Sequence, residues 1–375
     1  MQFRDLGAQY QVLKNEIDEG IQQVLDSSRF ILGEPVQKLE ESLAEYVGRA
    51  HCVGVANGTE ALQLSLMSMD IGPGDAVFTS DFTYFASAGC AAIIGATPVL
   101  VDIDLSTFNI SPEALEKKIC EVIQEGKLQP KAIIPVDLFG LPANYPAISR
   151  IAEKYGLKIL EDAAQGFGGQ INGKLACSFG EISATSFFPA KPLGCYGDGG
   201  AIFTDDGATD MRLRSLRASG KSPKDKYDNR EVGMNSRLDT LQAAILLPKF
   251  KAFRDYEVDA VNKVAARYTD ALNDYVVTPT VPENYLSSWA QYTVLIESKE
   301  KRDEVQKKLK DKGIPTMIYY PRGLHQQAAF DQYGYKDSEY PNTMEATRRV
   351  LSLPMHPYLN EEDQDMIINA LVEAL

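Results

Sequence analysis

The chain has 375 residues, of which 44% are hydrophobic, and its formal net charge at pH 7 is −14. This length predicts either two domains or one large domain with a smaller one appended. The acidic balance argues against a general surface for nucleic acid or anionic membrane, because neutralising phosphates requires clustered Lys and Arg. An anionic small ligand would therefore need local cations.

The cysteines and the first residues bear on the cellular compartment. The five cysteines are odd in number, far apart and without CxxC spacing, so they indicate neither a disulfide framework nor a zinc site. Residues 1–7 lack the apolar core of a signal peptide. We therefore expect a reduced, cytoplasmic chain without a bound metal.

Along the chain, helical patterns come first and then alternate with short apolar runs. Apolar residues at helical spacing predict helices over 10–27 and 36–47. From His51 onward, strands alternate with helical segments, which implies right-handed crossovers and a mainly parallel sheet between helices, with ligands at the carboxyl ends of its strands. The predicted strands are 52–56, 76–79, 98–103, 132–136, 157–160, 182–188 and 199–204.

One uncharged stretch, 82–101, is long enough to cross a membrane. Gly, Pro, Ser and Thr interrupt it, so it divides into a buried helix over 83–94 and a buried strand over 98–102. We therefore expect no membrane span there.

The rest of the chain predicts a mobile polar loop and then a smaller α+β unit. Residues 219–231 are polar and rich in turn formers. Residues 239–272 are helical, with an interruption at Pro248, and the patterns then change to strands over 292–296 and 314–318, a charged helix over 300–312 and a closing helix from Glu361. We expect a large domain over 1–250 and a small C-terminal domain over 251–375.

Lys191 lies on the predicted loop between the strands 182–188 and 199–204. Pro192 disfavours helical geometry at Lys191, and the following glycines let the backbone pass close to another group. A desolvated amine with cationic neighbours has a lowered pKa and attacks carbonyls, so the loop suits Schiff-base chemistry. The alternative is a solvated surface lysine, which is more common in glycine-rich loops.

Two further motifs follow predicted strands. Gly58 and Thr59 open a helix after the strand 52–56, where backbone N–H groups could bind a phosphate or Asn57 could act as an ordinary N-cap. Asp162 follows the strand 157–160, where it could be a cap or could face a ligand. Together with Lys191, these motifs supply an anion site, a carboxylate and an amine, which are the groups that hold pyridoxal phosphate.

Six motifs follow one another over nearly the whole chain: Asn57-Gly-Thr, Asp81-Phe-Thr-Tyr84, Glu161-Asp-Ala-Ala-Gln165, Ser186-Phe-Phe-Pro-Ala-Lys191, Gly197-Asp-Gly-Gly200 and Gly233-Met-Asn-Ser-Arg-Leu-Asp239. In this order they resemble the DegT/DnrJ/EryC1/StrS sugar aminotransferases, a branch of the fold-type I enzymes that use pyridoxal phosphate. The resemblance implies that Lys191 carries the cofactor and that Asp162 faces its ring nitrogen, with a homodimer as the working unit. It also implies a set of cofactor contacts: Gln165 near the ring hydroxyl, Tyr84 on the ring face, Gly58, Thr59 and Ser186 on the phosphate, and Asn235 reaching that phosphate from the neighbouring subunit.

Three longer stretches, Lys191–Phe203, Asn235–Pro248 and Ser352–Tyr358, carry a narrower likeness. Within that family they resemble most the bacterial aminotransferases that act on UDP-2-acetamido-2-deoxy-3-oxo-glucuronic acid in O-antigen synthesis. The similarity implies a nucleotide-sugar acceptor and glutamate as donor. Arg237 could bind a substrate carboxylate or form an ion pair with Asp239 or another acidic residue. Tyr320 and His325 are further candidates for substrate contacts, in a segment where Tyr319-Tyr-Pro321 replaces the usual His-Tyr-Pro.

Three alternatives remain at this stage. A 4-aminotransferase would act on a UDP- or dTDP-4-keto-6-deoxy sugar. The related sugar dehydratases carry histidine in place of the lysine, and Lys191 argues against them. A catalytically dead sensor or scaffold is a non-enzyme alternative, but it would not need Asp162, Gln165 and Lys191 together.

Overall fold

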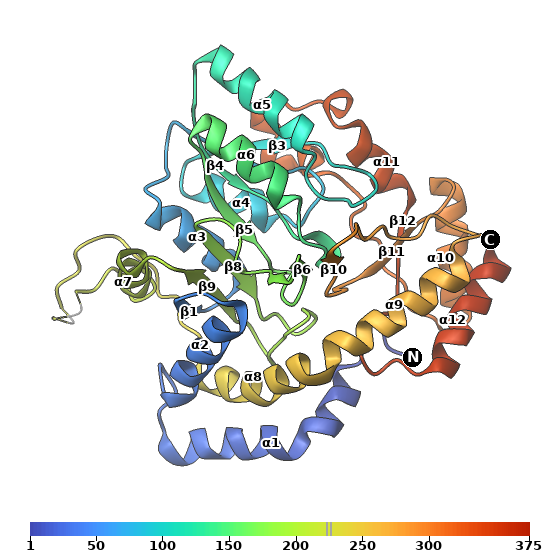
Figure 1. Ribbon diagram of the computed structural model, residues 1–375, viewed down its shortest axis with the longest axis horizontal. Coiled ribbons are helices and arrows are strands. Elements are labelled where there is room, and N and C mark those ends of the chain that lie inside the picture. The colour runs from blue at the N-terminus through green and yellow to red at the C-terminus, as the bar shows by residue number, and fades with distance from the viewer. Residues whose placement is uncertain (223, 226) are drawn as a thin grey trace.

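The computed structural model describes residues 1–222, 224–225 and 227–375, and a seven-stranded sheet forms its centre (Figure 1). The strand order is β1-β9-β8-β5-β4-β2-β3. Within this sheet, β9 is antiparallel to both of its neighbours, and the other pairs are parallel. The prediction of a mainly parallel sheet is therefore confirmed. The strands are β1 (His51–Val55), β2 (Asp75–Ser80), β3 (Thr97–Val101), β4 (Gln129–Ile134), β5 (Lys158–Asp162), β8 (Ile182–Ser186) and β9 (Gly200–Thr204).

Successive side chains of each strand enter cores on opposite faces of the sheet. In β4, Ala132 and Ile134 pack with one set of helices, whereas Ile133 packs with the other. Helices α3, α4 and α7 cover the first face, and α2, α5, α6 and α8 cover the second. The helices are α2 (Glu34–Val47), α3 (Gly58–Ser68), α4 (Ala86–Ile93), α5 (Pro112–Glu125), α6 (Tyr145–Tyr155), α7 (Gly207–Leu216) and α8 (Thr240–Ala252).

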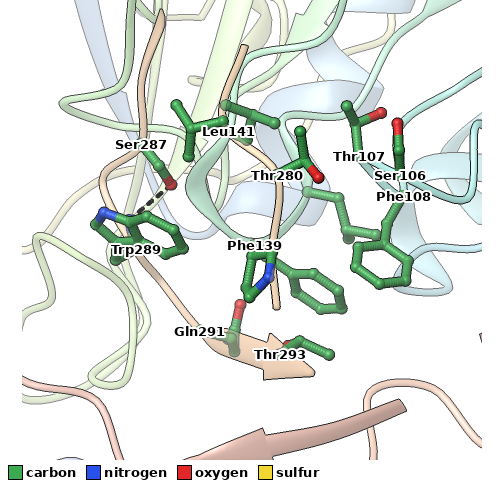
Figure 2. Close-up of a pocket in the computed structure, with 13 residues that line it drawn as sticks. Ser106, Thr107, Phe108, Phe139, Leu141, Thr280, Ser287, Trp289, Gln291 and Thr293 are labelled. Carbon is green, nitrogen blue, oxygen red and sulfur yellow. Dashed lines mark hydrogen bonds between the residues drawn. The ribbon is translucent and has the colours of Figure 1, made fainter. Parts of the chain in front are cut away.

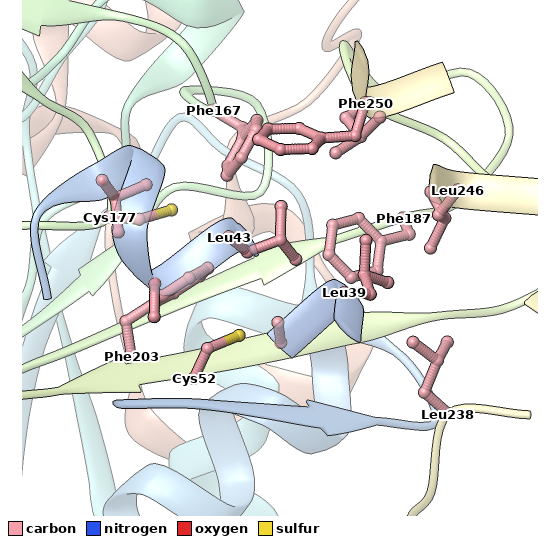
Figure 3. Packing of buried hydrophobic residues seen from close by; sticks show 14 of the residues in the cluster. Leu39, Leu43, Cys52, Phe167, Cys177, Phe187, Phe203, Leu238, Leu246 and Phe250 are labelled. Atoms are coloured by element: carbon pink, nitrogen blue, oxygen red, sulfur yellow. The ribbon is translucent and has the colours of Figure 1, made fainter. Parts of the chain in front are cut away.

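Aromatic and aliphatic side chains fill the core under α2 and α8. Figure 3 shows Leu39 and Leu43 of α2 facing Phe203 of β9, with Phe187 from the end of β8 beside them. Phe187 is fully buried and lies four residues before Lys191. The lysine loop therefore begins from a rigid part of the core, which limits where its amine can lie.

The C-terminal part builds a core of its own around a two-stranded sheet. β11 (Tyr292–Leu295) pairs antiparallel with β12 (Val350–Leu353). The buried side chains around them belong to residues between Val261 and Ala374. They include Trp289, which is buried and whose Nε1 donates to Asn262 Oδ1 at 2.9 Å. The helices here are α9 (Val258–Leu272), α10 (Lys299–Asp311), α11 (Pro341–Arg349) and α12 (Glu361–Ala374).

The proposed domain boundary falls inside a helical run. α8 continues through a π-helical turn, Phe253–Glu257, into α9, and α1 (Leu6–Ser27) lies along α8 (Figure 1). A three-stranded sheet joins β10 (Tyr285–Leu286) to β6 (Gln170–Ile171) and β7 (Lys174–Leu175). Segments on both sides of residue 250 therefore share structure, and the division into 1–250 and 251–375 stays a prediction.

The prediction of a strand over 314–318 is wrong. Ile314 donates its N–H to Leu309 O at the end of α10, and Pro315 has no N–H to donate. Met317 alone of this segment pairs with Ser352, as an isolated bridge. The segment is therefore an extended connection beside β12.

Two other segments stand out in the sequence. Residues 82–101 divide into α4 and β3, as predicted, and no helix among the described residues is long and apolar enough to cross a membrane. The described part of 219–231 contains no helix and one isolated bridge, between Lys221 and Asn229, and Pro223 and Lys226 lie outside the described residues. The mobility of this loop stays a prediction.

Candidate active site

A large cavity opens at the carboxyl ends of the strands. Because β9 is antiparallel to both β1 and β8, the strands β1, β5 and β8 run in the same direction and end at one edge of the sheet. The cavity there has a volume of about 910 Å³, which suits a small-molecule ligand. Eight of the predicted site residues line it: Gly58, Thr59, Tyr84, Asp162, Gln165, Ser186, Lys191 and Tyr320.

Lys191 is held by a tight loop after β8. Its backbone N–H donates to Phe188 O at 2.8 Å, and the Pro192 carbonyl accepts a hydrogen bond from Arg4 Nη2 at 3.2 Å. The turn closes at Gly194, where a Cβ atom would lie 2.5 Å from Pro189 O. Burial lowers the pKa of Lys191 to about 8; Asp162 opposes this shift and Arg4 adds to it. The loop therefore presents an amine that gives up its proton more easily than an exposed lysine does, although it is still mostly protonated at pH 7.

Asp162 ends β5 and faces the same cavity. Its Oδ2 accepts a hydrogen bond from Ser87 Oγ at 2.7 Å, and its Oδ1 accepts one from the Ala164 N–H at 3.2 Å. Burial raises the pKa of Asp162, while these hydrogen bonds and the charge of Lys191 act in the opposite direction. The two donors favour the ionised carboxylate, so Asp162 can pair with a cationic ring nitrogen.

The N-terminus of α3 forms an anion site on the cavity wall. Asn57 is its N-cap, accepting from the Glu60 N–H at 2.8 Å, which leaves the N–H groups of Gly58 and Thr59 without an intrahelical acceptor. A Cβ atom on residue 58 would lie 2.7 Å from the Ser186 Cβ, so only glycine allows α3 to approach β8 this closely. Both interpretations of the motif therefore apply, since the cap and the anion site are compatible.

Gln165 and Tyr320 are joined within the cavity wall. Gln165 Oε1 accepts from the Phe139 N–H at 2.8 Å, and its Nε2 donates to Tyr320 Oη at 3.2 Å. Burial raises the pKa of Tyr320, which keeps its hydroxyl protonated. Tyr84, in contrast, is 59% exposed on the cavity's open side. It is free of core packing and can contact a planar ligand.

Three predicted residues do not line this cavity. Asn235 is exposed and Arg237 is half-buried, both on the connection that leads into α8. No described residue forms an ion pair with Arg237, so the proposed pair with Asp239 is absent. His325 is buried behind the wall, with Nδ1 2.6 Å from Asp81 Oδ2, and the structure does not bring it into contact with the cavity.

The structure also reveals residues that sequence reasoning missed. Ser87 lies 75 positions from the aspartate to which it donates, on a helix whose sequence carries no sign of that contact. Arg322 lines the cavity from the segment that follows Tyr319-Tyr-Pro321. The sequence could have pointed to Arg322, because a cationic residue directly follows the Tyr319-Tyr-Pro321 segment that was already considered for substrate binding.

A second pocket has no charged residue in the described part of its lining. Figure 2 shows it between Phe108, Phe139 and Trp289, and its volume is about 20 Å³, enough for about one water. Among the described residues, no group of His, Cys, Asp and Glu is arranged to hold a metal ion. The cavity at the carboxyl ends of the strands is therefore the candidate active site.

An open, mainly parallel sheet with a lysine, an aspartate and a helix N-terminus at one edge defines an α/β enzyme that can hold an anionic cofactor beside a reactive amine. The chain belongs to the DegT/DnrJ/EryC1/StrS aminotransferase family, whose model matches residues 11–372. The resemblance seen in the sequence is thereby confirmed, and the protein is an enzyme of the aminotransferase class.

Individual relatives match almost the whole chain. A UDP-2-acetamido-2-deoxy-3-oxo-D-glucuronate aminotransferase from Pseudomonas aeruginosa is 45% identical over 99% of both chains. A UDP-N-acetyl-3-dehydro-alpha-D-glucosamine 3-aminotransferase from Acidithiobacillus ferrooxidans is 40% identical over 96% of this chain and 93% of the relative. A solved aminotransferase structure from Brucella abortus has a TM-score of 0.96 and 48% identity, covering 99% of this chain and 98% of its own, which confirms the expected fold.

Proposed function

We propose that the chain is a pyridoxal-phosphate-dependent aminotransferase that transfers the amino group of glutamate to the C3 keto group of UDP-2-acetamido-2-deoxy-3-oxo-glucuronic acid. One observation carries this proposal: Lys191, Asp162 and the N-terminus of α3 line a single cavity. The names of the two relatives described above support a 3-keto nucleotide sugar, since both act on one. The aminated sugar would enter a bacterial surface polysaccharide such as O-antigen, and the enzyme would work in the cytoplasm.

The residues of the cavity fit pyridoxal phosphate. The N–H groups of Gly58 and Thr59, with the Ser186 hydroxyl, supply donors for a phosphate at the positive end of the α3 dipole. Asp162 supplies a buried carboxylate for the ring nitrogen, and Gln165 lies beside it for the ring hydroxyl. Tyr84 lines the cavity and is exposed, so its ring is available to stack on a planar cofactor. No residue of this set is missing from the cavity wall.

When bound, the cofactor supplies a conjugated ring that takes up the electron pair of the broken C–H bond. Asp162 holds a proton on the ring nitrogen, which increases the ring's capacity for that charge. Lys191 Nζ takes the proton from the α-carbon of glutamate and later delivers a proton to C3 of the acceptor sugar. A pKa of about 8 suits both roles, because near neutral pH the amine exchanges protons readily.

The second subunit is part of this proposal. Asn235 and Arg237 lie outside their own cavity, and Asn235 is exposed, as expected of residues that complete a neighbour's site. We assign the phosphate contact to Asn235 and a substrate carboxylate to Arg237, both across a homodimer. Tyr320, on the wall beside Gln165, is assigned to the acceptor sugar.

The test is to incubate the purified enzyme with glutamate and each candidate keto sugar, generated in place by its dehydrogenase or dehydratase. Mass spectrometry and NMR then identify the aminated carbon. We expect amination at C3 of the uronate. Efficient amination of a 4-keto-6-deoxy sugar, with none of the 3-keto uronate, would overturn the substrate assignment and leave the cofactor and Lys191 in place.

A further inference from the structure

The charged residues that line the cavity are few and unevenly matched. Among the described lining residues, the acids are Glu60, Asp162 and Asp198, and the cations are Lys191 and Arg322. Lys191 is committed to the chemistry, so Arg322 is the cation that the chain's own wall leaves for an acidic substrate, in addition to the Arg237 assigned to it across the dimer. An acidic substrate needs such a cation because the whole chain carries a formal net charge of −14 and repels anions at long range.

The turn that carries Arg322 is anchored to the sheet. Asp81, directly after β2, accepts the N–H of Leu324 on its backbone carbonyl at 2.8 Å and the N–H of His325 on Oδ1 at 2.7 Å. A Cβ atom on Gly323 would lie 2.6 Å from Asp81 Oδ2, so glycine permits this contact. The residue after Arg322 is thus packed against the carboxyl end of β2.

The side chain of His325 completes the anchor. Its Nδ1 lies 2.6 Å from Asp81 Oδ2 and its Nε2 lies 3.1 Å from Asp337 Oδ1, while the Tyr340 ring stacks on the imidazole at 4.6 Å. Burial alone would lower the pKa of His325, but the hydrogen bonds and charges of Asp81 and Asp337 outweigh it and raise that pKa. His325 therefore orients the turn from behind the wall and does not itself touch a ligand in the cavity.

Arg322 itself has its donors available. It is exposed at the open side of the cavity, and no described residue forms an ion pair or side-chain hydrogen bond with it. Arg302 and Arg349, in contrast, donate to backbone carbonyls and to neighbouring carboxylates. A guanidinium presents five N–H donors in a planar fork, which matches the paired oxygens of a carboxylate or phosphate.

We infer that Arg322 binds acidic oxygens of the acceptor at the mouth of the cavity and so determines specificity for charged nucleotide sugars. The inference rests on the proposed function and adds a residue to it. With the keto carbon at Lys191 inside, the diphosphate of the nucleotide, or the uronate carboxylate, lies toward the open side where Arg322 stands. Both groups present anionic oxygens that a guanidinium can bind, and the experiment distinguishes the diphosphate from the carboxylate.

The test compares Arg322→Gln and Arg322→Lys with wild type and with Arg150→Gln, a control at an exposed arginine on α6 that does not line the cavity. For Arg322→Gln we expect KM for the uronate acceptor to rise about tenfold with kcat nearly unchanged, since one charge-assisted contact made in both ground and transition states is lost. Arg322→Lys should recover part of the loss. Calorimetric titration with UDP, which has the diphosphate but no carboxylate, is the second readout.

Each outcome decides the inference. Weaker UDP binding in Arg322→Gln identifies the diphosphate as the bound group, whereas unchanged UDP binding with a raised KM for the uronate identifies the carboxylate. An unchanged KM and unchanged UDP affinity overturn the inference. So does an equal loss in the glutamate half-reaction, measured by the cofactor absorbance, because Arg322 would then not be selective for the acceptor. A failure of the proposed function looks different, because wild type itself would then fail the glutamate half-reaction or fail to aminate the 3-keto uronate.

Discussion

At the scale of single residues, the state of Lys191 decides what the cavity can do. Burial lowers its pKa from an ordinary 10.5 to about 8, so the neutral, nucleophilic amine is present above about pH 8 and is lost as the pH falls through that value. In cofactor-free enzyme, the rate at which an amine-selective reagent modifies Lys191 should rise with a midpoint near pH 8. Peptide mass spectrometry measures this rate, with a free lysine derivative as control. A midpoint near 10.5 would show that the amine is solvated.

The hydrogen bond from Ser87 stabilises the ionised form of the Asp162 carboxyl. Removing a hydroxyl that donates to a buried carboxylate costs the ionised form about 1.5–3 kcal/mol, so Ser87→Ala should raise the pKa of Asp162 further. Since activity requires the carboxylate, the acidic limb of the kcat profile should move to higher pH, and kcat on that limb should fall about tenfold. Ser65→Ala, at a buried serine of α3 away from the cavity, is the control. If both variants show the same profile, Ser87 has no part in tuning Asp162.

At the scale of elements, the approach of α3 to β8 forms the phosphate site. Gly58→Ala would place a Cβ atom 2.7 Å from the Ser186 Cβ and force the helix away from the strand. We expect affinity of the cofactor-free enzyme for pyridoxal phosphate to fall about tenfold, because the N–H groups of the first turn no longer converge with Ser186. Absorbance titration measures the affinity.

The control for this variant is Gly72→Ala, where the nearest atom to a new Cβ lies 3.9 Å away. Thermal melting of both proteins without cofactor separates a general loss of stability from a local loss of affinity. Unchanged affinity in Gly58→Ala would mean that the phosphate binds elsewhere in the cavity.

At the scale of the whole molecule, the question is whether one chain contains a complete site. Lys191→Ala and Asn235→Ala should each be inactive and folded, because one residue lies in a loop and the other is exposed. If the site is shared, a mixed dimer has one site with both defects and one with neither, so mixing the variants should restore up to about a quarter of wild-type activity at random exchange.

Differently tagged subunits and native mass spectrometry verify that exchange has occurred before activity is measured. A mixture that contains hybrid dimers but no recovered activity would place Asn235 in the site of its own chain. Recovery would establish the homodimer as the catalytic unit.

Much of this molecule followed from local patterns in the sequence. The alternation of strands and helices predicts a parallel sheet, and such a sheet brings the residues after β1, β5 and β8 to one edge, so the sequence alone groups Gly58, Asp162 and Lys191. These inferences succeed because the spacing of apolar residues that marks a strand or a helix extends over only a few neighbouring residues.

Tertiary structure alone decided the rest. Ser87 meets Asp162 because α4 packs over the sheet, and His325 is buried because Asp81, 244 positions earlier, accepts its hydrogen bonds. The composition of the segment 314–318 predicted a strand, but only Met317 pairs with another segment, in an isolated bridge to Ser352. A hydrogen bond between distant segments depends on strand order and on the direction of helix packing, and no local periodicity encodes either of these.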